Sequence, residues 1–311
     1  MFVTVGRREE PEGERRGNRF NFLMASYAAT KKVSKKRTRC KPAVTTPTEL
    51  SIGAPLPTAE RSESISGVAV LPPGSEETWP HDKLFLSDLR VSCHSLFRDP
   101  AKSSVMALGG VLTKAETQAW RSFGDSKGFE RAFHREGNGI AYRDCGRISV
   151  EDEGIAAAIF MRIRNFLPPT LDSHRGSALW TLRGCSSNLR LYKYGPKQRF
   201  GRHYDESVQS DDGRACTFFT VLLYLNGEDA RERSAAAKGK EDVVEHTEGL
   251  RGGNTNFFHD NGTACCSFSP RQGFVLLHEH GDRCLLHEGA EVKSGFKYLL
   301  RTDVIYKRDN C

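Results

Sequence analysis

The sequence predicts an α+β domain whose second half is a β-sandwich or a β-barrel. Two observations support this prediction. Two amphipathic helical segments are expected between residues 112 and 167. From about residue 185 the chain changes to short segments rich in β-branched and aromatic residues, divided by Gly, Asn, Asp and Pro. Helices followed by many short strands are typical of a domain in which the helices cover a β core.

The first quarter of the chain differs in composition from the rest. Only 38% of the 311 residues are hydrophobic, and residues 1–78 are rich in Arg, Lys, Glu, Pro, Ser and Thr. We therefore expect a disordered basic N-terminal region over 1–78 and one folded domain over 79–311, with order beginning near Trp79. The basic cluster at 31–39 is typical of a nuclear-import signal, of a polyanion-binding tail or of a solvated charge run.

Charge and cysteine content bear on partners and location. The net charge of +7 comes partly from the basic N-terminal region, so it permits a nucleic-acid partner without indicating one. Nine scattered cysteines without a Cys-x-x-Cys favour reduced thiols. No apolar run approaches the roughly 18–20 residues of a membrane span, and the N-terminus lacks the apolar stretch of a signal peptide. We expect an intracellular protein, cytoplasmic or nuclear, without a membrane partner. From Met24 the composition also suits an organelle transit peptide, if translation starts there.

Capping signals mark where the two helices begin. Thr113 can cap the first helix together with Glu116, three residues on, and this helix is expected to end near Gly124. The second helix is expected to begin at Ser149 or Glu151, with acids in its first turn, and to stop before a Pro-Pro pair.

Strand signals follow in the second half of the chain. The strongest is the nearly continuous apolar run 217–225, which we expect to be buried on both faces. The β core is expected over about 185–308, interrupted by a charged and Ala-rich insertion at 228–250. Further strands are expected at 84–97, 189–194, 254–259, 273–277 and 296–306.

His203 and Asp205 form a His-x-Asp motif shortly after the expected strand 189–194. Side chains two residues apart on an extended segment project from the same face, so this imidazole and this carboxylate can bind one ion together. Two histidines and one carboxylate with open coordination positions suit non-haem Fe(II) and oxygen chemistry. Without a third ligand, the pair would be two ordinary surface residues.

Five later histidines are candidates for the third ligand. His278 and His280 stand just before a Gly-Asp pair, which predicts a polar turn. His259 also precedes a turn, and His246 lies in the expected insertion. His287 follows Cys-Leu-Leu, where a buried strand end is expected, and it is therefore the best placed of the five.

Several blocks of the sequence resemble the prolyl 4-hydroxylase-type 2-oxoglutarate/Fe(II) dioxygenases. The blocks come in the family's order and together cover about residues 188–306. They are Tyr194-(x)8-His203-x-Asp205, the apolar strand ending Tyr224-Leu225-Asn226, Gly252-Gly253-Asn254-Thr255-Asn256-Phe257, Ser269-Pro270-Arg271-Gln272-Gly273, and His287-Glu288-Gly289 with Val292, Gly295 and Lys297.

The resemblance implies a double-stranded β-helix, a jelly-roll-like core with N-terminal supporting helices. It also implies that His203, Asp205 and His287 are the catalytic iron ligands. The cofactors that it implies are Fe(II), 2-oxoglutarate and O2 as cosubstrates, and ascorbate. Two residues depart from the family pattern: Phe200 stands where relatives often carry tyrosine, and Leu223 stands where some relatives carry a tyrosine whose hydroxyl is aimed at the cosubstrate.

The resemblance assigns the cosubstrate contacts to residues outside the iron triad. Lys297, ten positions after His287, would bind the distal carboxylate of 2-oxoglutarate, and the hydroxyl of Tyr194 would reach the same molecule. Arg301 has the same strand parity as Lys297, so it is a rival or additional anchor for that carboxylate. It could equally form an internal ion pair with Asp303. Lys297 as a surface lysine and Tyr194 as a core tyrosine are the structural alternatives.

The activity implied by the resemblance is hydroxylation of a C–H bond, with release of succinate and CO2. A prolyl or other side chain of a protein or peptide is the expected substrate. One alternative is the same cofactor chemistry on a nucleic acid or a small molecule, and the basic N-terminal region supports the nucleic acid. The other alternative is a relative of the fold that binds a partner without catalysis. The sequence holds no signal for an oligomeric state.

Overall fold

The computed structural model describes residues 56–308, except 76–78, 81–83, 101, 138, 173–178 and 228–248. The chain divides into two units, 1–45 and 46–311, and every described residue belongs to the second. The predictions for the basic cluster, the transit peptide, His246 and most of the insertion therefore lie outside the described residues.

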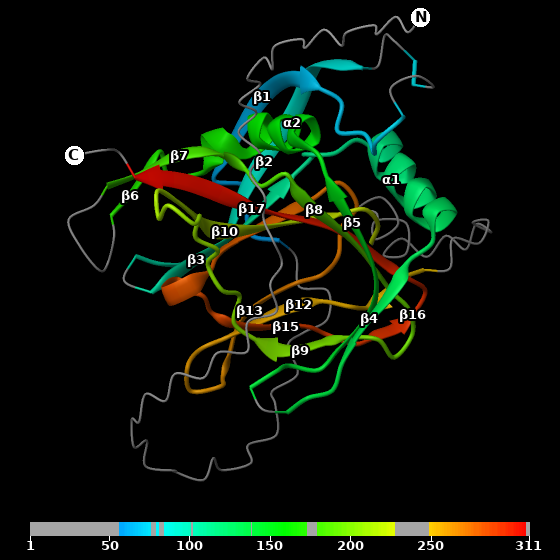
Figure 1. Ribbon diagram of the computed structural model, residues 1–311, viewed down its shortest axis with the longest axis vertical. Coiled ribbons are helices and arrows are strands. Elements are labelled where there is room, and N and C mark those ends of the chain that lie inside the picture. The colour runs from blue at the N-terminus through cyan, green and yellow to red at the C-terminus, as the bar shows by residue number, and fades with distance from the viewer. Residues whose placement is uncertain are drawn as a thin grey trace, which may run out of the picture. The chain divides into compact units, whose positions relative to one another are not determined.

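The described part of the chain is mostly β-structure, with two α-helices (Figure 1). The helices are α1 (Lys114–Lys127) and α2 (Glu153–Ile163), with short 3-10 turns at Arg164–Phe166 and Gly281–Arg283. The strands are β1 (Arg61–Val68), β2 (Phe85–Asp99), β3 (Ser103–Gly109), β4 (Glu130–His134), β5 (Arg143–Glu151), β6 (Thr170–Asp172), β7 (Leu179–Cys185), β8 (Asn188–Tyr194), β9 (Phe200–His203), β10 (Ala215–Tyr224), β11 (Arg251–Gly252), β12 (Thr255–Phe258), β13 (Ala264–Phe268), β14 (Val275–Glu279), β15 (Leu286–Gly289), β16 (Val292–Ser294) and β17 (Lys297–Arg308).

The strands form two layers that face each other, a large sheet and a small sheet. The large sheet has the order β1-β2-β3-β14-β10-β17-β8-β5, and the small sheet has the order β9-β15-β12-β13. One pairing, Arg143 with Phe200, joins β5 to β9 and so links the two sheets. From β8 onward the chain alternates between the layers, because β8, β10, β14 and β17 lie in the large sheet while β9, β12, β13 and β15 lie in the small one (Figure 1). This alternation is that of a double-stranded β-helix, and the predicted fold class is confirmed.

Alternation along the strands gives the large sheet two different faces. The outer face is apolar and packs against the two helices in one cluster. The inner face turns toward the small sheet and mixes apolar with polar side chains. Residues of the outer cluster include Trp120, Ile155, Ile159, Ile163, Leu189, Leu191, Phe219, Val221, Leu223, Val275, Leu277 and Leu300. Polar side chains thus enter the interior on the face where the two sheets meet.

Structural order begins before Trp79, so the predicted domain boundary is wrong. Strand β1 pairs with β2 in antiparallel register, with Arg61 opposite Cys93. Ile65 is buried in the same cluster as the helices. The segment contains few apolar residues, and its order comes from pairing with a distant strand, which a local hydrophobicity pattern does not reveal.

The first helix begins as predicted, and the second begins slightly later. Thr113 caps α1 in a capping box with Glu116, and the helix continues to Lys127, beyond the expected end near Gly124. The N-cap of α2 is Asp152, whose side chain accepts a hydrogen bond from the Ile155 amide. Ser149 and Glu151 belong instead to β5.

A buried ion pair joins the two helices. The Glu116 carboxylate lies 2.7 Å from the Arg162 guanidinium, and both side chains are 1% exposed. Glu116 also accepts a hydrogen bond from the Val70 amide, while Arg162 donates to the Val68 and Val111 carbonyls. The pair therefore connects both helices to the chain that leaves β1.

Glu116→Gln is expected to lower the free energy of unfolding by about 3–5 kcal/mol, because it leaves the Arg162 charge buried without its partner. Urea unfolding followed by circular dichroism measures the change. Glu153→Gln is the matched control, since Glu153 is an exposed acid in the first turn of α2. The control should lose less than about 1 kcal/mol. Equal losses in the two variants would contradict a special role for the buried pair.

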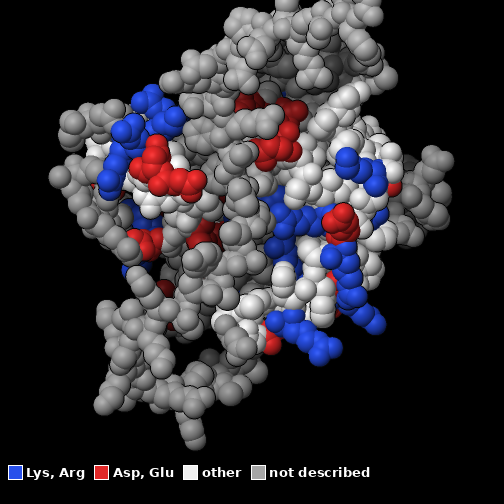
Figure 2. Space-filling model, in the orientation of Figure 1, with Lys and Arg blue, Asp and Glu red and all other residues white. Residues whose placement is uncertain are grey.

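The face of the molecule in Figure 2 does not present one continuous charge among the described residues. On the face shown in Figure 2, basic and acidic side chains of the described residues lie next to one another. Neither of the described helices has the length and apolar composition needed to cross a bilayer.

Candidate metal centre

Strand pairing brings the predicted triad together. In the small sheet His287 on β15 lies directly opposite His203 on β9. Asp205 follows β9, and its carboxylate lies between the two imidazoles. The Nε2 of His203 is 3.5 Å from Asp205 Oδ1, and the Nε2 of His287 is 3.7 Å from Asp205 Oδ2. Atoms of all three side chains that can bind a metal lie within 4.8 Å of one another.

Backbone carbonyls hold both imidazoles in one orientation. The Nδ1 of His203 lies 2.8 Å from the Gly201 carbonyl, and the Nδ1 of His287 lies 2.9 Å from the Leu285 carbonyl. Each Nδ1 therefore carries the proton, and each Nε2 offers its lone pair toward Asp205. The ring of Phe200 stacks on His203 with ring centroids 3.6 Å apart. Phenylalanine at this position thus fixes the first imidazole by packing.

The protonation states suit metal binding. Burial lowers the pKa of His287 to about 4, against the opposing effect of Asp205, so this imidazole is neutral at pH 7. Burial alone would raise the pKa of Asp205, but the Arg301 charge, the His203 contact and two further imidazoles hold it well below its usual range. Neutral imidazoles and an ionised carboxylate are the forms that ligate a metal ion.

Arg301 contacts the triad directly. Its guanidinium is 3.1 Å from Asp205 Oδ1 and 3.1 Å from Asp205 Oδ2. It also lies 3.2 Å from the Asp303 carboxylate, which in turn pairs with Arg190. The sequence allowed Arg301 to be either an anchor for 2-oxoglutarate or part of an internal ion pair with Asp303, and the contacts are those of the ion pair. Arg301 is thereby suited to orient Asp205, although it also lines the cavity beside the triad.

Lys297 is buried without a carboxylate partner among the described residues. Lys297 is the first residue of β17, and its side chain is buried on the inner face of the large sheet. Its Nζ donates a hydrogen bond to the Gly253 carbonyl. The rings of Tyr194 and Tyr224 have centroids 5.9 and 5.5 Å from Nζ. Burial lowers the pKa of Lys297 to about 7. The surface-lysine alternative is therefore wrong, and this buried cation is available for an anionic ligand.

Tyr194 faces the same space. It lies directly opposite Lys297 in the pairing of β8 with β17, and burial raises the pKa of its phenol well above the usual value. Tyr224 is the last residue of β10, and its hydroxyl lies 2.7 Å from Thr255 Oγ1. The Tyr224 ring therefore lies near Lys297 as well.

One cavity connects the metal triad with Lys297. Its volume is about 50 Å³, and all six residues predicted for the site line it. Arg143, which the sequence pattern did not single out, also lines it, with its guanidinium 4.8 Å from the centre of the Phe200 ring. The lining includes Arg143, Tyr194, His203, Asp205, His278, His287, Lys297 and Arg301.

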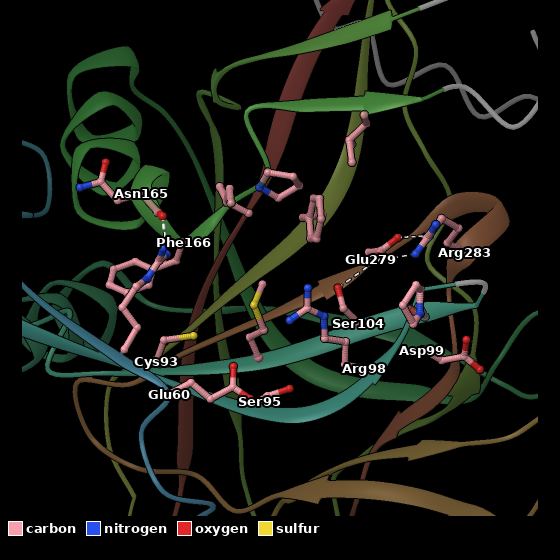
Figure 3. Close-up of a pocket in the computed structure, with 18 residues that line it drawn as sticks. Glu60, Cys93, Ser95, Arg98, Asp99, Ser104, Asn165, Phe166, Glu279 and Arg283 are labelled. Atoms are coloured by element: carbon pink, nitrogen blue, oxygen red, sulfur yellow. Dashed lines mark hydrogen bonds and ion pairs between the residues drawn. The ribbon is translucent and has the colours of Figure 1, made fainter. Parts of the chain in front are cut away.

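A larger cavity of about 600 Å³ lies elsewhere, between β2, β3 and the segment after α2 (Figure 3). Its described lining contains no histidine. Glu279 points into it and contacts Ser104 and Arg283. This cavity is on the opposite side of β14 from the triad, because Glu279 and its neighbour His278 project to opposite faces. None of the described side chains that line it belongs to a group of His, Cys, Asp or Glu close enough together to hold a metal ion.

His278 and His280 are buried, and the prediction that they lie in a polar turn is wrong. His278 is the fourth residue of β14 and His280 follows the strand, with exposures of 1% and 3%. The ring nitrogens of His280 lie 3.0 Å from the hydroxyls of Thr220 and Thr217, so both are engaged. His280 and Asp282 form a second His-x-Asp motif, but this imidazole is held by the two threonines.

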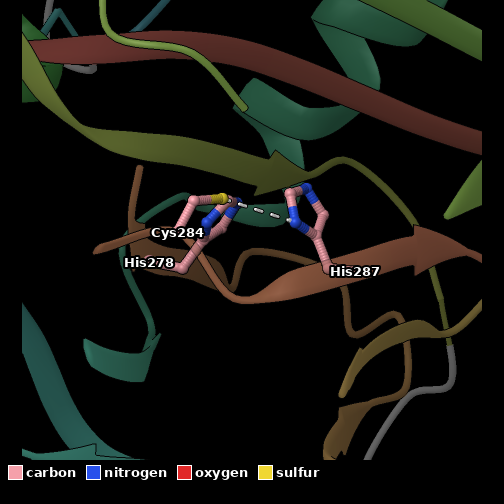
Figure 4. A group of neighbouring side chains, drawn as sticks. All are labelled: His278, Cys284 and His287. Atoms are coloured by element: carbon pink, nitrogen blue, oxygen red, sulfur yellow. Dashed lines mark hydrogen bonds between the residues drawn. The ribbon is translucent and has the colours of Figure 1, made fainter. Parts of the chain in front are cut away.

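His278 and Cys284 lie beside His287 (Figure 4). These three side chains form a second group whose ligand atoms are within 4.8 Å of one another. Burial raises the pKa of the Cys284 thiol to about 12, so it is protonated at neutral pH, whereas metal binding needs the thiolate. The sulfur already accepts a hydrogen bond from the Asp205 amide. The triad of His203, Asp205 and His287 is therefore the better metal site.

The donor set fits Fe(II). Two imidazoles and one carboxylate on one side of an ion leave further coordination positions open, and this is the arrangement of non-haem Fe(II) oxygenases. His259 takes no part in it, because its ring packs against Phe97 with centroids 5.8 Å apart.

Comparisons with known proteins give similarities of fold. The chain is similar to a viral collagen prolyl hydroxylase from Paramecium bursaria Chlorella virus-1 in complex with 2-oxoglutarate, with 19% identity over 65% of this chain and 96% of that chain and a TM-score of 0.41. It is also similar to a prolyl-4-hydroxylase from Pseudomonas putida, with 16% identity over 66% of this chain and 93% of that chain and a TM-score of 0.39, and to a prolyl hydroxylase from Trichoplax adhaerens in complex with a peptide fragment of hypoxia inducible factor, with 15% identity over 64% and 82% and a TM-score of 0.41. A 2OG-Fe(II) oxygenase family protein from Burkholderia pseudomallei is similar with 10% identity over 68% of this chain and 87% of that chain and a TM-score of 0.39. No family model and no curated protein matches the chain.

Proposed function

We propose that the protein is a 2-oxoglutarate- and Fe(II)-dependent dioxygenase that hydroxylates a C–H bond. The observation that supports this most is the pairing of two features in one cavity. One is a His-His-carboxylate group oriented for a metal ion, and the other is the buried ammonium of Lys297. An ion ligand that also carries a second, remote carboxylate would satisfy both features at once.

Each residue has a role in this proposal. His203, Asp205 and His287 hold the ion, and Arg301 keeps the Asp205 carboxylate in place. Lys297 pairs with the distal carboxylate of 2-oxoglutarate, with Tyr194 beside it. The bound ion together with O2 and 2-oxoglutarate supplies the oxidising chemistry, in which the 2-oxo acid becomes succinate and CO2.

The proposed substrate is a prolyl or other side chain of a protein or peptide. This part of the proposal comes from the resemblance of the sequence blocks to the prolyl 4-hydroxylase type. The adjacent basic and acidic side chains in Figure 2 give no continuous basic surface on that face for a nucleic-acid backbone.

Succinate release by the purified full chain tests the proposal. With Fe(II), ascorbate and 2-oxoglutarate, the wild-type protein should form succinate and CO2 slowly even without substrate. His203→Ala should abolish this turnover, whereas His94→Ala, on β2 away from the cavity, should retain it. If wild-type protein bound neither Fe(II) nor 2-oxoglutarate, the proposal would be refuted. Peptides that gain one oxygen atom in a mass-spectrometric screen would identify the substrate, and gain on oligonucleotides alone would contradict the peptide assignment.

A further inference from the structure

A third imidazole, that of His278, approaches the metal triad from the large sheet. Its Nε2 is buried and has no hydrogen-bond partner among the described residues. Its distance to Asp205 Oδ2 of the triad is 3.8 Å, which is too far for a hydrogen bond. Its side chain is 2% exposed, so bulk water does not solvate this nitrogen.

The ring of His278 is arranged like the rings of the two triad histidines. Its Nδ1 lies 3.2 Å from the Glu279 carbonyl, just as the other two Nδ1 atoms lie near backbone carbonyls. Its ring centroid is 4.6 Å from that of His287, and Phe257 packs against both rings, at 5.2 and 5.5 Å. All three imidazoles therefore direct Nε2 toward the one carboxylate of Asp205.

The backbone fixes this position of His278. On β14, alternation places Leu276 and His278 on the inner face and Leu277 on the outer face. His278 lies directly opposite Thr220 of β10, whose hydroxyl donates to Asp205 Oδ2. The ring is thus held beside the carboxylate by a central strand pair.

A buried nitrogen without a partner is costly. A buried polar group without a hydrogen bond destabilises a protein by about 1–3 kcal/mol, and such groups in native proteins call for an explanation. A cation bound by the triad would give Nε2 of His278 a partner, because this nitrogen faces the same carboxylate as the two ligand imidazoles.

We propose that His278 is a fourth protein ligand of the ion in the resting site, before 2-oxoglutarate binds. This inference rests on the proposed function, since it concerns the same ion. His278 with the triad makes a donor set of three imidazoles and one carboxylate. A chelating 2-oxo acid occupies two positions of a six-coordinate ion and O2 occupies one, so only three positions are left for protein ligands. His278 therefore gives up its position when 2-oxoglutarate arrives, which keeps the cosubstrate-free ion less open to O2.

The number of coordinated imidazoles tests this proposal independently of turnover. Pulsed EPR of the full chain loaded with Cu(II) should show three imidazoles in the wild-type protein and two after 2-oxoglutarate is added. His278→Phe should show two under both conditions. The affinity of the His278→Phe variant for Co(II), measured against a competing chelator, should fall at least about tenfold. Losing a contact around a metal site typically lowers metal affinity by about 10–100-fold, and this expectation is the lower end of that range. His278→Gln, which keeps a donor atom, should recover part of that affinity.

Matched controls separate the possible failures. His259→Phe replaces a nearby histidine that faces Phe97 and should leave the imidazole count and the affinity unchanged. Thermal unfolding of each variant shows whether it folds. Two imidazoles in the cosubstrate-free wild-type protein would overturn the role of His278 and leave the proposed function intact. Absence of binding of Cu(II), Co(II) and Fe(II) by the wild-type protein would overturn both.

Discussion

Lys297→Met is expected to make the ligand-free protein more stable and to abolish its response to 2-oxoglutarate. The ammonium is buried without a carboxylate partner, so folding has to desolvate a charge that a methionine would not bring. One pKa unit corresponds to about 1.4 kcal/mol, and the lowered pKa of Lys297 therefore predicts a gain of at least about 1 kcal/mol. Thermal unfolding with and without 2-oxoglutarate measures both effects. Lys293→Met, an exposed lysine on β16, is the control and should change neither.

The stability gain should depend on pH with a definite sign. The pKa of Lys297 is lowered to about 7 in the folded protein, below its unfolded value of about 10.4. The unfolded chain therefore binds more protons between these values, and the wild-type protein gains stability as the pH rises through this window. The advantage of the methionine variant should be greatest at or below pH 7 and shrink above it. An advantage that grew from pH 7 to pH 9 would contradict the assignment.

Binding of 2-oxoglutarate should also depend on the titration of Lys297, but it should weaken as the pH rises, whereas the stability of the protein increases. The distal carboxylate pairs with the protonated ammonium, so the apparent Kd should increase above pH 7, and binding near pH 8 should take up a proton. Calorimetry in buffers of different ionisation enthalpy measures this uptake. The Lys297→Met variant should show none.

Asp205→Asn is expected to cause the second large effect, a loss of both metal binding and stability. The carboxylate is a triad ligand, and its removal also takes a charge away from the buried Arg301 guanidinium. Breaking a buried pair from one side costs about 3–5 kcal/mol, and because Asp303 still contacts Arg301 the lower end of this range is expected. Metal titration and urea unfolding of the metal-free protein measure the two losses separately.

His203→Ala distinguishes the two roles of Asp205. This variant also loses a metal ligand, but it leaves the pairing of Arg301 with Asp205 intact. The metal-free protein should therefore lose much less stability than Asp205→Asn does. If both variants were destabilised equally, Arg301 would not depend on Asp205 in the way the contacts indicate.

The sequence predicted the β core well because local patterns and tertiary structure agree there. The apolar run 217–225 became β10, the central strand between β14 and β17. The predicted triad meets in space because one register pairs His203 with His287. The order of the motif blocks can be seen in the sequence, and the contacts follow once the strands alternate between the two sheets.

The missed features depend on contacts that no local pattern contains. Strand β1 is ordered by pairing with β2, and β9 is only four residues long. The sequence predicts a turn at His278 because a Gly-Asp pair begins three residues later. Its strand parity was the available signal, since Leu276 and His278 alternate with Val275 and Leu277 along one apolar segment. That parity places His278 on the same face of the sheet as Lys297.

The two halves of the site differ in the strands that hold them. Strand β17, which begins at Lys297, is 12 residues long and pairs with β7, β8 and β10. Strand β9, which ends at His203, has four residues. Amide hydrogens of β17 should therefore exchange only when the whole domain unfolds, whereas those of β9 should exchange through local opening. Chelators could then remove the ion, and fresh ion could replace it, while the anion-binding strand stays folded.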